Sequence, residues 1–239
     1  MTAKDIIIFA GVAGGGKTVA RSITRELMER QGFTCQLISD GETLVSIVEE
    51  DQERNWHVRP HENEGNPAFC ITHQYPLDEA VRRWVAQVPP TQEGQISLVE
   101  VARGVGSRYP ELDLSFGRLL ENGLVPQEIW QRSVMVYIRT PRYLRFAWNE
   151  ERRENPRSQL GEVSFFVPPS AMETLFGASD FKGRLLPGLK EMGVPTYTIN
   201  NDTEGFALFR RNVEGVASQI LRTHLPKEGQ LRVNKERGQ

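Results

Sequence analysis

The sequence predicts an α/β fold, a three-layer sandwich in which helices cover both faces of a parallel sheet of about five strands. Three observations support this expectation. Residues 6–10 form an uninterrupted apolar run, which is typical of a strand buried on both faces of a parallel sheet. A glycine-rich segment follows this run and leads directly into a helix-forming stretch. Strand-like and helix-like segments then alternate along the chain, as in folds built from strand–helix–strand units.

The expected strands are short segments rich in apolar and β-branched residues, each bounded by turn residues. They are residues 6–10, 34–39, 96–101, 133–138 and 196–199. In a parallel sheet the carboxyl ends of all strands lie at one edge, and ligands bind there. The residues that directly follow each strand are therefore the first candidates for chemistry.

The helices are expected where apolar residues recur every three or four positions along one face. They span residues 17 to about 30, 41–50, 76–85, 144 to about 157, 182–192 and about 203 to 221. Val19, Ile23 and Leu27 show this spacing in the first helix, and Pro76 suits the first turn of the third. Residues from about 54 to 75 lack such a pattern. They are polar and rich in Asn, His and Pro, which predicts an irregular excursion.

Length and composition indicate one domain. The chain has 239 residues, enough for one core with a small lid, and we expect a domain at 1–225 and a polar tail at 226–239. A net charge of −2 provides no electrostatic case for binding nucleic acid or a membrane. The run at 6–10 is too short for a signal sequence or a membrane span, so we expect a cytoplasmic protein. Cys35 and Cys70 lack metal-ligand spacing and are expected to be buried thiols.

The glycine-rich segment matches the phosphate-binding pattern G-x-x-x-x-G-K-[ST] without a mismatch. It reads Gly11-Val12-Ala13-Gly14-Gly15-Gly16-Lys17-Thr18 and lies between an expected strand and an expected helix, as the pattern requires. Glycines let the backbone curl so that several N–H groups point at phosphate oxygens, and the helix N-terminus adds partial positive charge. Lys17 is expected to reach the β- and γ-phosphates, and Thr18 to ligate Mg²⁺. We therefore expect a nucleoside triphosphate to bind along residues Gly11 to Val19.

This segment resembles the phosphate loop of the P-loop NTPase superfamily, which implies ATP or GTP together with Mg²⁺. The order of the other segments, over roughly residues 5–222, resembles the small-molecule and nucleotide kinases of that superfamily, without pointing to a particular family. GTPases of the superfamily carry a base-reading Asn-Lys-x-Asp motif, which Asn200-Asn201-Asp202-Thr203 does not match. In the kinases this turn often borders the adenine base. It is equally well explained as a polar turn before the last helix.

Two carboxylates and an arginine stand where strands end. Glu100 resembles the second acidic motif of the superfamily, which implies support of Mg²⁺ and its waters, although Asp is commoner there and a purely structural carboxylate is the alternative. Arg103 follows it, and in small kinases an arginine at this place commonly holds the acceptor. Asp40 follows the second strand, where several small kinases place the residue that accepts the proton of the attacking hydroxyl. Asp40 is equally suited to cap the helix that begins near residue 41.

Six arginines follow the fourth expected strand: Arg139, Arg142, Arg145, Arg152, Arg153 and Arg157. The segment at about 140–170 resembles the lid of small-molecule kinases, which implies that one or two of these arginines close over the transferring phosphoryl group. We favour Arg153 and Arg157 for that role. The arginines from 145 to 153 alternate with Glu150, Glu151 and Glu154, so a solvated helix with ion pairs is the simpler interpretation for the rest.

Together these features predict an ATP-dependent kinase for a small polar acceptor, held between the excursion at about 54–75 and Arg103. The excursion offers polar and aromatic side chains for acceptor contacts, namely His57, Arg59, His61, Glu62, Asn63, His73, Gln74 and Tyr75. A nucleoside, a nucleotide, a sugar and a metabolite acid all remain open as acceptor. Two alternatives share the phosphate loop. One is a polynucleotide end kinase, which the net charge disfavours, and the other is a nucleotide-dependent switch or regulatory ATPase without an acceptor.

Overall fold

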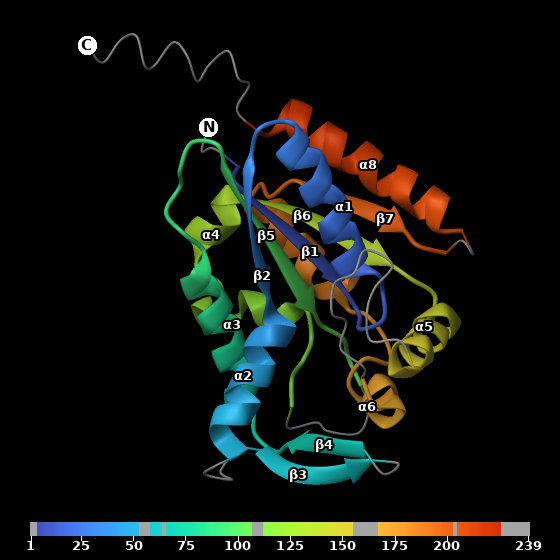
Figure 1. Cartoon of the computed structure of the whole chain (residues 1–239). Helices are drawn as coiled ribbons and strands as arrows, with labels where there is room; N and C mark the ends of the chain where they lie inside the picture. Colours follow the sequence, from blue (N-terminus) through green and yellow to red (C-terminus); the bar gives the residue numbers. More distant parts are fainter. Residues whose placement is uncertain are drawn as a thin grey trace.

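A computed structural model of the chain describes residues 4–52, 58–63, 66–106, 112–154, 167–202 and 205–225 (Figure 1). Five strands form one parallel sheet: β1 (Ile6–Gly11), β2 (Thr34–Ser39), β5 (Gln95–Ala102), β6 (Ser133–Arg139) and β7 (Thr196–Asn200). Their order across the sheet is β2-β5-β1-β6-β7, so β1 is the central strand. The predicted α/β fold with a five-stranded parallel sheet is confirmed.

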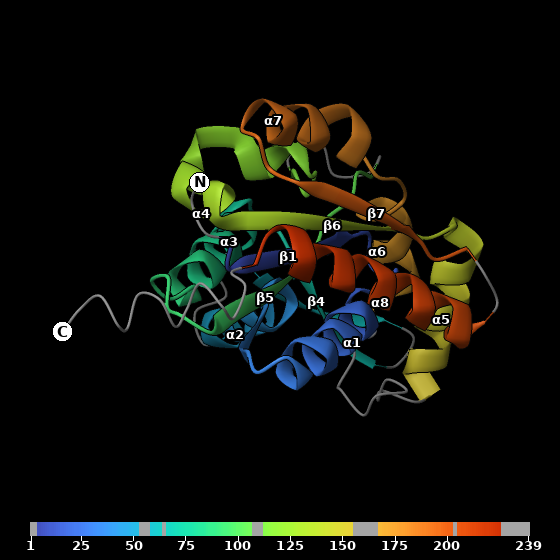
Figure 2. The ribbon, with the colours of Figure 1, turned by 90° about the horizontal axis from the view of Figure 1, so that it is seen from above.

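Helices connect the strands and cover both faces of this sheet (Figure 2). The α-helices are α1 (Lys17–Arg30), α2 (Asp40–Gln52), α3 (Tyr75–Gln87), α4 (Gln127–Arg132), α5 (Arg142–Glu154), α6 (Pro169–Thr174), α7 (Leu186–Glu191) and α8 (Phe206–Thr223). Two shorter elements are the 3₁₀ helix η1 (Gly117–Gly123) and the π-helical turn η2 (Phe181–Leu185). Among the described residues, no helix is both long and apolar enough to cross a membrane.

The core divides into two apolar layers because alternate residues of each strand point to opposite faces of the sheet. Ile7 and Phe9 of β1 pack in the layer beneath α1 and α8, whereas Ile6 and Ile8 pack in the layer that contains residues of α3, α4 and α7. All six residues of β1 are buried. The central strand therefore holds the start of the phosphate loop rigidly between two packed layers.

The polar excursion contains regular structure, so the prediction of an irregular backbone was wrong there. β3 (Val58–Asn63) and β4 (Asn66–Ile71) pair antiparallel, with Pro60 opposite Phe69. A ribbon of two strands has only edge strands, and edge strands tolerate proline. Figure 1 shows the hairpin at the bottom of the view, beyond the end of α2 that is remote from β2.

The helix expected at 182–192 begins one residue earlier and has two parts. Phe181–Leu185 forms the π-helical turn η2, and the α-helical part starts only at Leu186. Pro187 occupies the first turn of α7, where its missing N–H group leaves no donor unsatisfied. The proline thus explains why the regular hydrogen-bond pattern restarts at this position.

The thiol expected at Cys35 is half-buried and free in the described part of the chain. Burial raises its pKa to about 11, and the neighbouring Glu29 carboxylate adds to this shift. A thiol with so high a pKa is almost entirely protonated at neutral pH and is therefore unreactive. The side chain of Cys70 lies outside the described ones.

Candidate functional site

The phosphate loop joins β1 to α1, and its shape depends on two glycines with positive φ. Gly14 has a φ of +79° and Gly16 one of +88°, a region that residues with a Cβ atom rarely adopt. Space is also missing at both positions. A Cβ atom on Gly14 would lie 2.7 Å from the carbonyl oxygen of Arg145, and one on Gly16 would lie 2.6 Å from Nδ2 of Asn201. Neighbouring elements therefore pack directly against the loop.

Two polar side chains from other strands hold the outer side of the loop. The hydroxyl of Thr140, just after β6, donates to the carbonyl oxygen of Gly15 at 2.9 Å. Nδ2 of Asn201, just after β7, donates to the same oxygen at 3.1 Å, and Asn201 is buried. Neither residue was singled out from the sequence as a support for the loop. The usable signal was their position directly after strands, which places them at the same edge of the sheet as the loop.

Lys17, Thr18 and Glu100 come together where the loop opens α1. Lys17 is buried, and its Nζ donates to the carbonyl oxygen of Val12 at 3.1 Å and lies 4.0 Å from Oε1 of Glu100. The hydroxyl of Thr18 donates to Oε1 of Glu100 at 3.0 Å. Burial lowers the pKa of Lys17, and the carboxylate of Glu100 opposes that shift. Glu100 thus stabilises the charged form of Lys17, which is shielded from solvent.

The same carboxylate faces a second cation from α1. NH1 of Arg21 lies 3.8 Å from Oε2 of Glu100 and donates to the carbonyl oxygen of Ile38 at 3.2 Å. Glu100 therefore lies between Lys17 and Arg21. A carboxylate with two cations and a hydroxyl around it is held in one orientation, which is what a group that serves a metal ion or its waters requires.

Asp40 and Arg103 form a buried ion pair at the ends of β2 and β5. Arg103 is 7% exposed, Asp40 is 4% exposed, and NH1 of the arginine lies 2.6 Å from Oδ2 of the aspartate. The backbone N–H of Ala102 donates to the same oxygen at 2.9 Å. Burial raises the pKa of Asp40, whereas Arg103 and the Ala102 hydrogen bond oppose that shift. Asp40 is thus rigidly held next to the loop and within electrostatic reach of Lys17.

The first turn of α2 is capped by Ser39. Its hydroxyl oxygen accepts a hydrogen bond from the backbone N–H of Glu42 at 3.4 Å, and its carbonyl oxygen accepts one from the hydroxyl of Thr43 at 2.8 Å. The carboxylate of Asp40 points to β5 instead. Of the two roles considered for Asp40, helix capping belongs to its neighbour, and the role of proton acceptor stays a prediction.

The arginines of α5 lie in three different environments. Arg145 is 4% exposed, and its NH1 and NH2 donate to the carbonyl oxygens of Phe176 and Gly177 at 2.7 and 3.2 Å. Arg152 lies close enough to Glu100 and Lys17 for its charge to affect both, and burial lowers its pKa. Arg153 is exposed and pairs with Glu150 at 3.2 Å. The interpretation of α5 as a solvated, ion-paired helix therefore fits Arg153 but fits neither Arg145 nor Arg152.

Some predicted site residues lie outside the described ones. These are Arg157 and the side chains at 57, 59 and 61–63. Val19 is half-buried in the first turn of α1. Gln74, from the end of the excursion, donates to Oδ1 of Asp78 at 2.8 Å and binds the backbone of Asp113, so it serves the framework of α3.

No protein-family model matches the chain, and no curated protein matches its sequence. Among solved structures, shikimate kinase from Acinetobacter baumannii in complex with shikimate is 18% identical over 93% of this chain and 96% of its own, with a TM-score of 0.48. The APS kinase of Mycobacterium tuberculosis in complex with AMPPNP and APS is 10% identical over 92% and 99%, with a TM-score of 0.48. Kti12 from Chaetomium thermophilum in complex with ADP-AlF3 is 15% identical over 88% and 96%, with a TM-score of 0.45. At identities and TM-scores this low, residue roles have to be derived from contacts within this chain.

Proposed function

We propose that this chain is an ATP-dependent phosphotransferase that transfers the γ-phosphoryl group to a small polar acceptor. The observation that carries the proposal is that Lys17, Thr18 and Glu100 meet where the phosphate loop leads into α1. In phosphoryl transfer, catalysis is mostly positioning and neutralisation of charge. The buried lysine would neutralise charge. The oriented carboxylate and the hydroxyl, which lie at the N-terminus of α1, would position the metal ion and the phosphates.

The nucleotide would lie along residues Gly11 to Val19, with the backbone N–H groups of the loop and of the first turn of α1 as donors to its phosphates. Lys17 would exchange its contact with the Val12 carbonyl oxygen for one with the β- and γ-phosphates. GTP remains an alternative to ATP.

The residues present fit Mg²⁺. Thr18 Oγ1 and Glu100 Oε1 are hard oxygen atoms 3.0 Å apart, of the kind that Mg²⁺ takes together with phosphate oxygens and water. Thr18 would ligate the ion and Glu100 would hold its waters. When bound, Mg²⁺ supplies positive charge against the phosphate oxygens.

Asp40 would serve as the general base. Its carboxylate would accept the proton of the acceptor hydroxyl while that oxygen bonds to the γ-phosphorus, and ADP leaves with the electrons of the broken phosphorus–oxygen bond. Burial raises the pKa of Asp40 from its ordinary value, which makes the carboxylate a stronger base. Arg103, which is committed to Asp40 and to the Ala102 carbonyl oxygen, would orient this base.

An arginine supplied in cis would let this chain complete its own site. Arg152 lies within electrostatic reach of Lys17 and Glu100 in the chain alone. A catalytic arginine already present in the chain suits an enzyme that completes its own site. Arg153 and Arg157 were favoured for the lid from the sequence. Arg157 remains a candidate, whereas Arg153 is exposed and paired with Glu150, so we favour Arg152 over its neighbour.

The test is ATP consumption by the purified protein with Mg²⁺, alone and with a panel of nucleosides, nucleotides, sugars and small acids. We expect one compound to stimulate consumption and to appear as its phosphorylated product by mass spectrometry. The control is Lys17→Met, in which the rate should fall by roughly 10²–10³-fold because one preorganised contact with the phosphates is lost. Slow hydrolysis that no compound stimulates would exclude a small-molecule kinase and favour the switch or the end kinase.

Glu100→Gln is expected to raise the Mg²⁺ concentration needed for half-maximal ATP consumption. The amide keeps the shape of the carboxylate but loses its charge, and loss of such a supporting partner typically weakens metal affinity by about 10–100-fold. The matched control is Glu29→Gln, since Glu29 is an exposed carboxylate of α1 that lies 4.0 Å from Arg25. An unchanged Mg²⁺ requirement in Glu100→Gln would show that Glu100 is only a structural carboxylate.

A further inference from the structure

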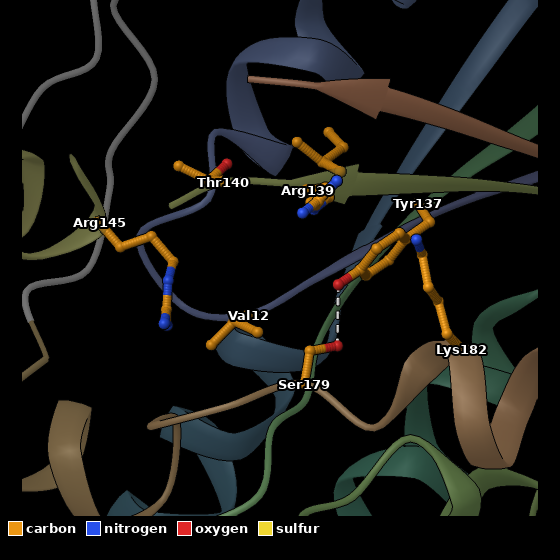
Figure 3. A pocket seen from close by; sticks show the side chains of 8 residues that line it. Val12, Tyr137, Arg139, Thr140, Arg145, Ser179 and Lys182 are labelled. Carbon is orange, nitrogen blue, oxygen red and sulfur yellow. Dashed lines mark hydrogen bonds between the residues drawn. The ribbon is translucent and has the colours of Figure 1, made fainter. Parts of the chain in front are cut away.

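A cavity of about 270 Å³ lies beside the phosphate loop, at the carboxyl end of β6 (Figure 3). Its walls come from four parts of the chain: Val12 of the loop, residues from Tyr137 to Thr140, Arg145 of α5, and the segment with Ser179 and Lys182. The volume is slightly below the usual range for small-ligand sites, so it suits a small group better than a whole nucleotide.

The cavity is strongly cationic. Figure 3 shows Arg139, Arg145 and Lys182 around it, each from a different element, and none of the residues that line it is acidic. Within the described parts of the chain, no carboxylate pairs with any of these three cations. Nε of the buried Arg145 also lacks an acceptor among the described residues. A buried cation without a counter-charge is unfavourable, and an anion in the cavity would offset this.

Hydroxyl groups complete the lining. The hydroxyl of Tyr137 donates to Oγ of Ser179 at 2.8 Å, and the backbone N–H of Phe181 donates to the same oxygen at 3.3 Å. With its oxygen accepting both bonds, Ser179 can donate its own hydrogen into the cavity. The Tyr137 ring stacks on Phe181 with centroids 4.0 Å apart. These contacts fix the donor in place, as a specific site requires.

The cavity adjoins the part of the loop that would face the transferred phosphate. Val12 lines the cavity, and its carbonyl oxygen accepts the hydrogen bond from Nζ of Lys17 at 3.1 Å. Lys17 is the residue assigned to the β- and γ-phosphates. A molecule anchored in the cavity would therefore lie next to the reacting end of the nucleotide.

We propose that this cavity binds the anionic group of a small acidic acceptor, either a carboxylate or a phosphate. The proposal rests on the proposed kinase function and names the substrate class of that enzyme. It also places the acceptor's anionic group at Arg139, Arg145 and Lys182, whereas the sequence suggested Arg103 as the residue that holds the acceptor. Arg103 is 7% exposed and is already bound to Asp40.

The test is calorimetric titration of inorganic phosphate, and separately of succinate, into the protein saturated with Mg²⁺ and a non-hydrolysable ATP analogue. The analogue occupies the phosphate loop, so any remaining anion binding belongs elsewhere. We expect one saturable site. Lys182→Met should weaken it by about tenfold, the effect of losing one charge-assisted hydrogen bond. The matched control is Lys190→Met, which removes an exposed lysine of α7 outside the cavity and should change nothing.

Binding of phosphate alone would indicate a phosphorylated acceptor, and binding of succinate alone a carboxylic acid. Absence of saturable binding for both ions, or equal affinity in wild type, Lys182→Met and Arg139→Met, would overturn the proposal. Failure of the kinase function can be told apart from failure of the acidic-acceptor proposal. If no acceptor stimulates ATP consumption while the cavity still binds anions, the function is wrong; if only neutral acceptors are phosphorylated, and equally by Lys182→Met, the acidic acceptor is wrong.

Discussion

Replacing Arg152 with methionine is expected to lower phosphoryl transfer by about 10³-fold, the lower end of the range for an arginine that neutralises charge in the transition state. Arg152 lies on α5 within electrostatic reach of both Lys17 and Glu100, and burial lowers its pKa. Methionine keeps most of the aliphatic length and removes the charge. The affinity for Mg²⁺ and the ATP analogue should change only a few-fold, because the charge matters most while the phosphoryl group is in transfer.

The neighbouring arginine provides the control for this variant. Arg153 lies on the same helix, is exposed and pairs with Glu150 at 3.2 Å. Arg153→Met should therefore transfer phosphate at close to the wild-type rate, since exposed helical ion pairs contribute only about 0.3–0.5 kcal/mol. Single-turnover rates with saturating nucleotide would compare the two variants directly. If both variants lost the same amount of activity, the total positive charge of α5 would matter and the position of Arg152 would not.

Asp40→Asn is expected to reduce transfer by roughly 10²–10⁴-fold, the usual contribution of a general base. Nucleotide binding should persist, since Asp40 makes none of the hydrogen bonds that hold the loop. The variant should also be less stable. It leaves the buried charge of Arg103 without its carboxylate, and breaking a buried pair in this way typically costs about 3–5 kcal/mol. Transfer rates and the free energy of unfolding in urea measure the two effects separately.

Arg103→Met tests the role of Asp40 as a base while the aspartate itself is kept and only its ion-pair partner is removed. Arg103 holds the pKa of Asp40 down against the effect of burial, so its removal should raise that pKa further. Because a base acts only when deprotonated, activity in Arg103→Met should fail at a higher pH than in wild type as the solution is acidified. At higher pH, the rate of phosphoryl transfer by Arg103→Met should remain much greater than that of Asp40→Asn. An acidic limb that does not move would exclude Asp40 as the base.

Local sequence was sufficient for the phosphate loop and the central strand. The loop pattern depends on glycines within eight consecutive residues, and the all-apolar run before it is typical of a strand buried on both faces. The packing contacts at Gly14 and Gly16 confirm that these positions need glycine. Lys17, Thr18 and Glu100 also meet as expected, because carboxyl ends of parallel strands share one edge of the sheet.

It was harder to predict which side chains outside the phosphate loop face the site. The sequence favoured Arg153, whereas we propose Arg152. Neighbouring residues on a helix are rotated by about 100°, so Arg152 is half-buried while Arg153 is exposed. The hairpin β3–β4 was missed because the sequence of β3 lacks the apolar alternation that indicates a strand. The missed hairpin reflects weak apolar patterning, whereas the choice between Arg152 and Arg153 stays a prediction.

The sequence by itself determined the α/β class, the pattern of the phosphate loop and the order of strands along the chain. These depend on short-range periodicity and on residues that are neighbours in sequence. Only the tertiary structure decided that Ser39 caps α2, that Arg103 is bound to Asp40, and that Arg139, Arg145 and Lys182 surround one cavity. Such assignments depend on which strand ends and loops become neighbours in the folded chain. Contacts across 63 residues, as between Asp40 and Arg103, leave no local signal.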